Sequence, residues 1–224
     1  GAIDVVVDQS LRDAGAIQTL AIEVVRRAIE WPEPEGEVTL SVGGEDTWLA
    51  AIAGELGFVN SGEAEFRSSS VQLPADLDVM VPPGFRIVGM DGAVDLDERV
   101  QAHRDVWAPS KFTRADYDLL RAAEGYRGDL DLAAVAADGT IASYAIGWFD
   151  PVSRFGQLEP VGTRAASRGQ GLGKAVIATV LNRLRGYGAV GCRVLSEEEN
   201  VASNALYRSV GFRPTMRLEV WKRG

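Results

Sequence analysis

The sequence predicts an α/β fold built on a mixed (α+β) sheet, and three observations lead to this prediction. Short β-branched apolar runs alternate along the 224 residues with stretches whose apolar residues recur at helical spacing. Asp138-Gly139 joins two such runs and is a strong signal for an antiparallel hairpin. A stretch that contains Pro82, Pro83 and Gly84 predicts a linker over residues 75–84, between segments 1–74 and 85–224.

The first segment is expected to alternate strands and helices. The β-branched and apolar runs predict strands at residues 3–7, 38–42 and 66–73. Apolar residues from Ile17 to Ile29 recur at helical spacing and predict one helix. A second helix is expected to begin at Asp46 as its cap, to run through Leu56 and to end at Gly57.

The second segment is longer and shows the same two periodicities. Strands are predicted at residues 85–90, 130–137, 140–149, 155–163, 190–195 and 217–221. Helices are predicted at residues 95–107, 114–123, 172–184 and 200–210, with Thr113 as the cap of the second of these.

Charge and composition exclude several function classes. The chain has 23 Lys and Arg against 32 Asp and Glu, a net charge of −9, which opposes a nucleic-acid or anionic-membrane partner. Cys192 and His103 stand alone in their types, which excludes an internal disulfide and opposes a metal site. No membrane-length apolar run and no signal-peptide pattern is found, so the expected location is the cytoplasm. Because the chain begins with Gly1, processing or truncation stays open.

The two segments align as a partial repeat. A shift of 156 places residues 5–7 on 161–163 and aligns the apolar residues of the two helices that follow. A shift of 154 places Gly57-Phe58 on Gly211-Phe212. The first segment therefore resembles only the second half of the second segment. The alternative is that any two α/β segments align loosely.

A glycine-rich loop between a strand and a helix has the composition of an anion site. It reads Arg168-Gly169-Gln170-Gly171-Leu172-Gly173-Lys174. Glycines let backbone N–H groups converge on a phosphate, and the helix N-terminus adds positive charge. Ala175 follows Lys174, so the loop is not a P-loop, and Lys174 occupies the place of the third glycine of a dinucleotide fingerprint. The alternative is a strand-to-helix turn with no ligand.

Two motifs in this order resemble those of the GNAT superfamily of N-acetyltransferases. Arg168, Gly171 and Gly173 match the R-x-x-G-x-G loop that binds the pyrophosphate of coenzyme A. Residues 200–212 match N-x-x-[AS]-x-x-L-Y-x-x-x-G-F, from Asn200 through Tyr207 to Phe212. The resemblance covers residues 85–224. It implies a GNAT acetyltransferase fold preceded by a degenerate, partial GNAT-like unit, a tandem plan similar to that of mycothiol synthase relatives.

The resemblance implies an acyltransferase that moves an acetyl group from acetyl-CoA to a primary amine by direct attack in a ternary complex, with no metal. Tyr207 is then the general acid, unless it is only a core aromatic. Glu159 shares strand parity with Val161 and Thr163, which makes it the candidate base or else a solvated glutamate. Glu197, Glu198 and Glu199 are competing carboxylates.

The strand before the loop is expected to hold the pantetheine arm. Pro160 cannot donate a ladder hydrogen bond, so it predicts a bulge or a splayed edge, and the resemblance assigns the exposed backbone of this strand to the arm. The residues expected to bind acetyl-CoA are Val161, Gly162, Thr163, Arg168, Gly169, Gln170, Gly171, Leu172, Gly173, Lys174 and Asn200.

Acceptor contacts are expected from Trp107, Phe112 and Trp148, although an aromatic cluster also suits a core. His103 is expected on the surface or at a helix cap, and Cys192 in the core. The acceptor is a small-molecule or peptide amine whose identity the sequence leaves open, as it does a homodimer.

The first segment is expected to be inactive, because the motif residues are replaced in it. Asp13 stands for Gly169, Ile17 for Gly173, Asp46 for Asn200 and Ala53 for Tyr207. Two readings from other classes remain: a non-catalytic acyl-CoA-binding sensor or regulatory module, and a structural interaction protein with an exposed sheet edge.

Overall fold

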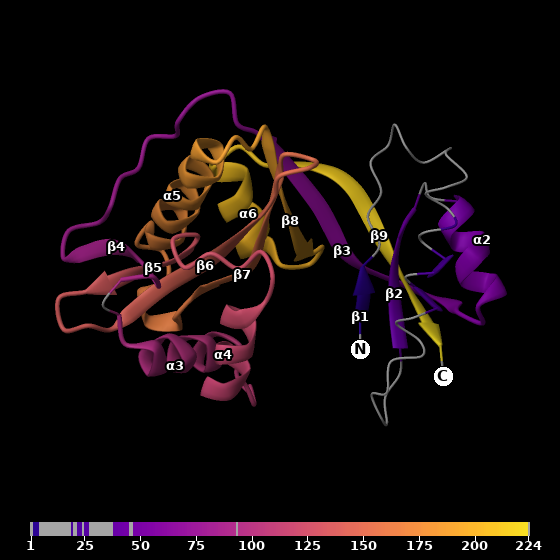
Figure 1. Ribbon diagram of the computed structural model, residues 1–224, viewed down its shortest axis with the longest axis horizontal. Helices are drawn as coiled ribbons and strands as arrows, with labels where there is room; N and C mark the ends of the chain where they lie inside the picture. The colour runs from indigo at the N-terminus through magenta and orange to yellow at the C-terminus, as the bar shows by residue number, and fades with distance from the viewer. Residues whose placement is uncertain are drawn as a thin grey trace. The chain divides into compact units, whose positions relative to one another are not determined.

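The computed structural model describes residues 2–4, 19, 22–23, 25–26, 38–44, 47–92 and 94–223 (Figure 1). The chain divides into two compact units. Unit 1 comprises Gly1–Ser68, Ser196–Glu199 and Pro214–Gly224, and unit 2 comprises Ser69–Leu195 and Asn200–Arg213. Unit 1 therefore combines strands from both ends of the sequence, and unit 2 is built from the middle.

Unit 1 holds a sheet in the order β1-β2-β9-β3 and one described helix. These elements are β1 (Ala2–Asp4), β2 (Val38–Gly43), α2 (Thr47–Glu55), most of β3 (Val59–Gln72) and most of β9 (Arg213–Arg223). β1 lies parallel to β2, and β2 lies antiparallel to β9. The core buries Val25, Leu40, Val42, Leu49, Ala53 and Phe58.

The sequence predictions for unit 1 are met in part. Strand β3 begins at Val59, before the predicted start at residue 66. Asn60 and Gly62 are residue types that favour turns, but here they lie within the strand. Helix α2 agrees with prediction, while its expected cap Asp46 and most of the predicted helix 17–29 lie outside the described residues.

Two turns that the repeat places in register have the same geometry. Gly57 and Gly211 both adopt a left-handed backbone, with φ of 84° and 98°. Phe58 N donates to Ala53 O at 2.9 Å, and Phe212 N donates to Tyr207 O at 3.1 Å. Each turn thus ends a helix with a hydrogen bond from a backbone N–H to the carbonyl five residues earlier, and it places a buried phenylalanine in the core of its own unit.

Unit 2 is a mixed sheet with helices on both faces (Figure 1). From the last residues of β3, the strand order is β3-β8-β7-β6-β5-β4. The remaining strands are β4 (Phe85–Gly89), β5 (Asp131–Ala136), β6 (Ile141–Asp150), β7 (Phe155–Thr163) and β8 (Gly191–Glu197). The helices are α3 (Leu96–Val106), α4 (Arg114–Ala122), α5 (Leu172–Gly186) and α6 (Val201–Ser209). The predicted hairpin at Asp138-Gly139 is confirmed, since β5 and β6 pair antiparallel across it.

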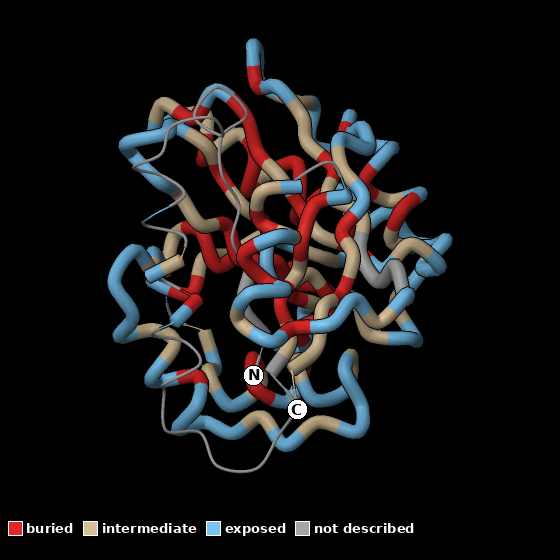
Figure 2. Tube along the Cα trace, turned by 90° about the vertical axis from the view of Figure 1, so that its right-hand side faces the viewer, coloured by how far each residue is buried: buried red, intermediate tan, exposed pale blue. Residues whose placement is uncertain are grey.

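The core of unit 2 has two layers, one on each face of the sheet. Figure 2 marks the buried residues along the trace in red. Strand β5 supplies both, because Leu132 and Ala134 pack on the α5 side while Ala133 and Val135 pack on the α3 side. Cys192 is fully buried as predicted, and burial raises the pKa of its thiol. Within the described ranges, no helix is long and apolar enough to cross a membrane.

Strand β7 leaves its neighbour halfway along its length. It pairs in parallel with β8 only from Phe155 to Leu158, but it stays paired with β6 as far as Thr163. The β6 register changes between Leu158 and Val161, so Glu159 and Pro160 form a bulge. Both outcomes predicted from Pro160 are therefore present, and the last residues of β7 have no β8 partner on one edge.

Candidate active site

Two cavities in unit 2 share β7 as a wall. The loop cavity has a volume of about 560 Å³ and is lined by Val106, Trp107, Val161, Gly162, Thr163, Ser167, Arg168, Gly169, Gly171, Leu172, Gly173, Lys174, Asn200, Ala202, Ser203, Ala205, Leu206, Tyr207 and Ser209. The arginine cavity has a volume of about 640 Å³ and is lined by Arg99, His103, Phe112, Tyr117, Leu120, Ile146, Trp148, Gln157, Glu159 and Pro160.

The loop cavity is positively charged although the chain is acidic. Its lining includes Arg168 and Lys174 and no Asp or Glu. Gly171 is the N-cap of α5 with φ of 83°, and no acidic residue lies in the first turn that follows. The first N–H groups of α5 therefore face an electropositive space, which is the arrangement that binds phosphate groups.

The predicted acetyl-CoA residues line this cavity with one exception. Arg168 is held by a hydrogen bond from its Nε to Thr163 O at 3.2 Å. Asn200 Oδ1 accepts from Ser203 N at 3.0 Å and caps α6, which leaves its amide NH₂ as a donor. Gln170 does not line the cavity, because its side chain folds back and donates to Ala166 O at 3.3 Å.

Tyr207 lies two turns after Asn200 on α6 and lines the same cavity. Its side chain is 7% exposed and meets Phe212 edge to face. Among the residues that the structure describes, its hydroxyl has no hydrogen-bond partner. Burial, and then the negative charge of Glu159, raise the pKa of Tyr207 to about 12. The hydroxyl is therefore protonated at neutral pH and can donate.

Glu159 lies in the β7 bulge and lines the arginine cavity. The bulge breaks the strand parity that sequence analysis used, so Glu159 does not share a cavity with Val161 and Thr163. Gln157 Nε2 donates to Glu159 Oε2 at 2.8 Å, and Trp148 Nε1 donates to the Glu159 carbonyl at 2.8 Å. The negative charge of Glu159 nevertheless contributes to the raised pKa of Tyr207 in the other cavity.

The competing carboxylate Glu198 has another partner set. It forms ion pairs with Arg67 at 2.8 Å and Arg217 at 2.9 Å, and all three residues belong to unit 1. The hydrogen bond from Arg67 is the main reason that the pKa of Glu198 is lowered. Glu198 is thus engaged in a structural network.

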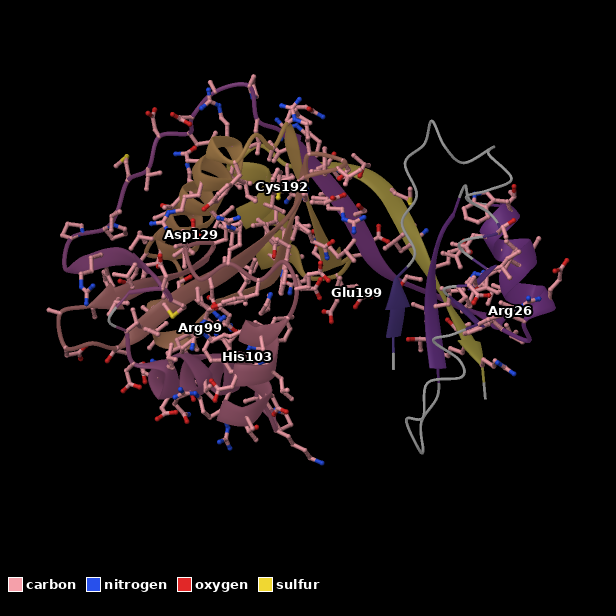
Figure 3. All side chains as sticks on the ribbon, viewed as in Figure 1. Arg26, Arg99, His103, Asp129, Cys192 and Glu199 are labelled. Carbon is pink, nitrogen blue, oxygen red and sulfur yellow. The ribbon has the colours of Figure 1, made fainter. Side chains whose placement is uncertain are left out.

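The arginine cavity contains groups that sequence analysis missed. Arg99 is 1% exposed, and its Nε donates to Asp131 Oδ1 at 3.2 Å. Asp131 also accepts from Tyr117 at 2.7 Å and from Tyr126 at 3.1 Å. The one usable signal was spacing, since Arg99 and His103 are four residues apart and share one face of α3 (Figure 3).

The expected surface position of His103 is wrong. The ring is half-buried, 4.3 Å from the Phe112 ring between centroids, and it lines the arginine cavity. Burial, and then the charge of Arg99, lower the pKa of His103 to about 4, so it is neutral at pH 7. Its Nδ1 lies 3.0 Å from the Tyr144 hydroxyl, which accepts from Trp107 Nε1 at 2.9 Å.

The three predicted acceptor aromatics are divided between the cavities. Phe112 and Trp148 line the arginine cavity. Trp107 lines the loop cavity instead and is 50% exposed.

We expect Asp131→Ala to destabilise the protein by about 3–5 kcal/mol, because it leaves the buried Arg99 guanidinium without its carboxylate. Urea unfolding at pH 7 measures this difference. Asp118→Ala removes an exposed helical ion pair with Arg114 and should change little. Equal effects of the two substitutions would show that the buried pair has no special role.

Sequence comparison identifies the class of protein that this site and fold define. The model of the acetyltransferase (GNAT) family matches residues 97–212, and the chain belongs to this family. It is thus a member of an acyltransferase family whose proteins use acetyl-CoA as co-substrate. No group of three or more His, Cys, Asp or Glu in the described part of the chain could hold a metal ion.

Individual relatives agree with the family. The chain is 25% identical over 173 residues to mycothiol acetyltransferase of Nocardia farcinica (strain IFM 10152), covering 73% of this chain but only 57% of that protein. The crystal structure of a GCN5-related N-acetyltransferase from Sphaerobacter thermophilus matches with a TM-score of 0.68 at 18% identity, over 99% of this chain and 72% of that one. A tandem GNAT protein from the clavulanic acid biosynthesis pathway matches with a TM-score of 0.66 at 20% identity, over 99% and 74%. At these identities, the similarity of this chain to the two structures concerns the fold.

Proposed function

We propose that the chain transfers an acetyl group from acetyl-CoA to a primary amine by direct attack within a ternary complex. The observation that carries the proposal is the pair of cavities divided by β7, with Tyr207 in one and Glu159 in the other. The electropositive loop cavity suits the co-substrate, and the aromatic arginine cavity suits the acceptor. The acceptor is a small-molecule or peptide amine.

The loop cavity would hold acetyl-CoA through its fixed donors. Arg168, Lys174 and the first N–H groups of α5 face the pyrophosphate. The backbone of Val161 to Thr163, which has no β8 partner, is available to the pantetheine arm. The Asn200 amide NH₂ adds a further donor beside this path.

Glu159 and Tyr207 would divide the proton transfers. An alkylammonium has a pKa of about 10 and is charged at neutral pH, so it must lose a proton before its nitrogen can attack. Glu159 accepts that proton, directly or through water, and the C–N bond forms at the thioester carbon. The nitrogen of the tetrahedral intermediate then loses its second proton to solvent. When the C–S bond breaks, Tyr207 donates its hydroxyl proton to the leaving sulfur and is reprotonated from solvent, and Glu159 releases the proton that it accepted, so one proton is released per acetyl group transferred. A free β7 N–H group suits the developing oxyanion.

Calorimetric titration of acetyl-CoA, followed by a thiol-release assay over a panel of primary amines, tests the function. We expect one site per chain and amine-dependent release of coenzyme A. Binding without release for any amine would favour the acyl-CoA sensor. The absence of both heat and thermal shift would contradict the transferase proposal.

We expect Glu159→Gln to lower kcat/KM about 10- to 100-fold at pH 7, because the bound ammonium loses its proton acceptor. The deficit should shrink as the pH approaches about 10, where the free amine predominates without a base. The pH profile of kcat/KM measures this, with Gln157→Ala as the control that keeps the Glu159 carboxylate but removes its hydrogen-bond donor, together with the acceptor of Arg193. A pH-independent deficit would argue against a role as base.

We also propose that the first segment is a degenerate repeat unit without a coenzyme A site. The equivalent turns at Gly57 and Gly211 support the repeat. Ala53, the counterpart of Tyr207, is fully buried and offers no hydroxyl. Asp13, Ile17 and Asp46 lie outside the described residues, so this part of the comparison stays a prediction. The stoichiometry of acetyl-CoA binding tests it, since two sites per chain would contradict it.

A further inference from the structure

Arg99 is more fully buried than its hydrogen bonds explain. The residue is 1% exposed, but among the described residues only its Nε has a hydrogen-bond partner, Asp131. Its Nη1 is buried and has no hydrogen-bond partner among the described residues. A buried donor on a charged group that makes no bond costs free energy, and a ligand that supplied the acceptor would recover it.

The role of counter-ion to Asp131 does not account for the whole guanidinium. Asp131 receives two further hydrogen bonds, from the hydroxyls of Tyr117 and Tyr126. The Arg99 guanidinium carbon lies 3.7 Å from the centre of the Tyr144 ring, so the fork is held in a fixed plane. Arg99 is thus a preorganised cation with donors to spare, and it lines the arginine cavity.

His103 adds a second donor next to Arg99. Tyr144 accepts from Trp107, so its own hydroxyl proton is free to go to His103 Nδ1. This assigns the proton of the neutral imidazole to Nε2, the nitrogen that has no partner in the described structure. Arg99 and His103 lie four residues apart on α3 and line the same cavity, so both can offer N–H groups to it.

The rest of the cavity has a different character. Phe112, Leu120, Ile146 and Trp148 form apolar walls, and Glu159 supplies a carboxylate at the β7 bulge. The volume of about 640 Å³ is that of a site for a small molecule with one or two rings. A ligand that satisfies every part of the lining has an ammonium for Glu159, an apolar body and an anionic acceptor for Arg99.

We infer that the acceptor is an amine that also carries a carboxylate, and that Arg99 binds this carboxylate with His103 as a second donor. The inference rests on the proposed transferase function for its amine end only. The carboxylate end stands on the unpartnered guanidinium and can be tested without turnover. A planar fork matches a carboxylate with two parallel hydrogen bonds, which a lysine cannot do.

The binding test uses 3-phenylpropanoate and its uncharged isostere 3-phenylpropanamide, titrated by calorimetry into the full chain. We expect the acid to bind at least 10-fold more tightly than the amide. Arg99→Lys keeps a positive charge opposite Asp131 and should reduce this ratio below about 3-fold, with an unchanged Kd for acetyl-CoA. The comparison of the two ligands on the unmodified protein holds even if the variant fails to fold. Equal binding of acid and amide, or no binding of either, would overturn the inference.

The turnover test uses amines of matched basicity, 4-(aminomethyl)benzoate, 4-(aminomethyl)benzamide and benzylamine. We expect the carboxylate to give the highest kcat/KM, with the advantage in KM, and Arg99→Lys to reduce the ratio of kcat/KM between the carboxylate and benzylamine. Turnover of all three amines without a preference would overturn the inference and leave the transferase proposal standing. If none is acetylated but the acid still binds through Arg99, the transferase proposal fails and carboxylate recognition stands.

Discussion

Replacement of Tyr207 by phenylalanine should lower kcat about 10²- to 10⁴-fold, the range that a positioned general acid contributes. The substitution removes one oxygen and keeps the ring that packs against Phe212. Folding and the Kd for acetyl-CoA should therefore be unchanged. Single-turnover measurement of thiol release at saturating amine isolates the step in which sulfur leaves.

The pH dependence of this variant follows from the direction of the pKa shift. Since the pKa of Tyr207 is raised to about 12, its hydroxyl stays protonated from pH 6 to 9 and contributes no break to the wild-type profile there. The loss caused by Tyr207→Phe should be constant across that range. Tyr187→Phe, at a surface tyrosine that bonds to Arg127, is the matched control and should keep full activity. If kcat were unchanged in Tyr207→Phe, Tyr207 would not be the general acid.

Replacement of Gly171 by glutamate should weaken acetyl-CoA binding at least 100-fold, about 2.7 kcal/mol. The new carboxylate would stand at the N-terminus of α5, where the phosphates are expected, and would repel them. The left-handed backbone at this position, with φ of 83°, adds strain of about 1–2 kcal/mol for any residue with a Cβ atom. Calorimetry measures the affinity, and thermal unfolding measures the strain.

Gly139→Glu separates these two effects. Gly139 has φ of 91° in the β5–β6 turn and does not line the loop cavity, so the variant introduces the same charge and the same strain elsewhere. It should lose stability but keep its affinity for acetyl-CoA. If both variants bind acetyl-CoA equally well, the pyrophosphate does not lie at the α5 N-terminus.

Local signals predicted most of the fold. The β5–β6 hairpin follows from Asp138-Gly139, and α4 begins after Thr113, whose hydroxyl accepts from Asp116 N at 3.2 Å. The early start of β3 could not be predicted, because a strand through Asn60 and Gly62 depends on its neighbours and not on its own propensities. The pairing of β2 with β9 could not be predicted from one sequence either, because local residue patterns do not determine which distant strands pair.

The candidate site divides in the same way. Motif spacing placed Asn200, Tyr207 and the loop in one cavity, because helix and loop geometry relate residues that are close in sequence. Glu159 was assigned to that cavity by strand parity, and the bulge at Pro160 moved it to the other one. Arg99 carried no motif, and only the contacts of Asp131, Tyr117 and Tyr144 around it show that its donors are unused.

Unit 1 is built from segments at both ends of the chain, and this limits which fragments of the protein can fold alone. Pro214–Gly224 belongs to unit 1, where β9 lies against β2. A gene fragment that starts at residue 85 would encode both signature motifs but leave β9 without β2, as an unpaired edge prone to aggregation. Co-expression of fragments 1–84 and 85–224 should restore soluble material by complementation where either alone fails. The first segment would then be needed for a soluble fold whether or not it binds a ligand of its own.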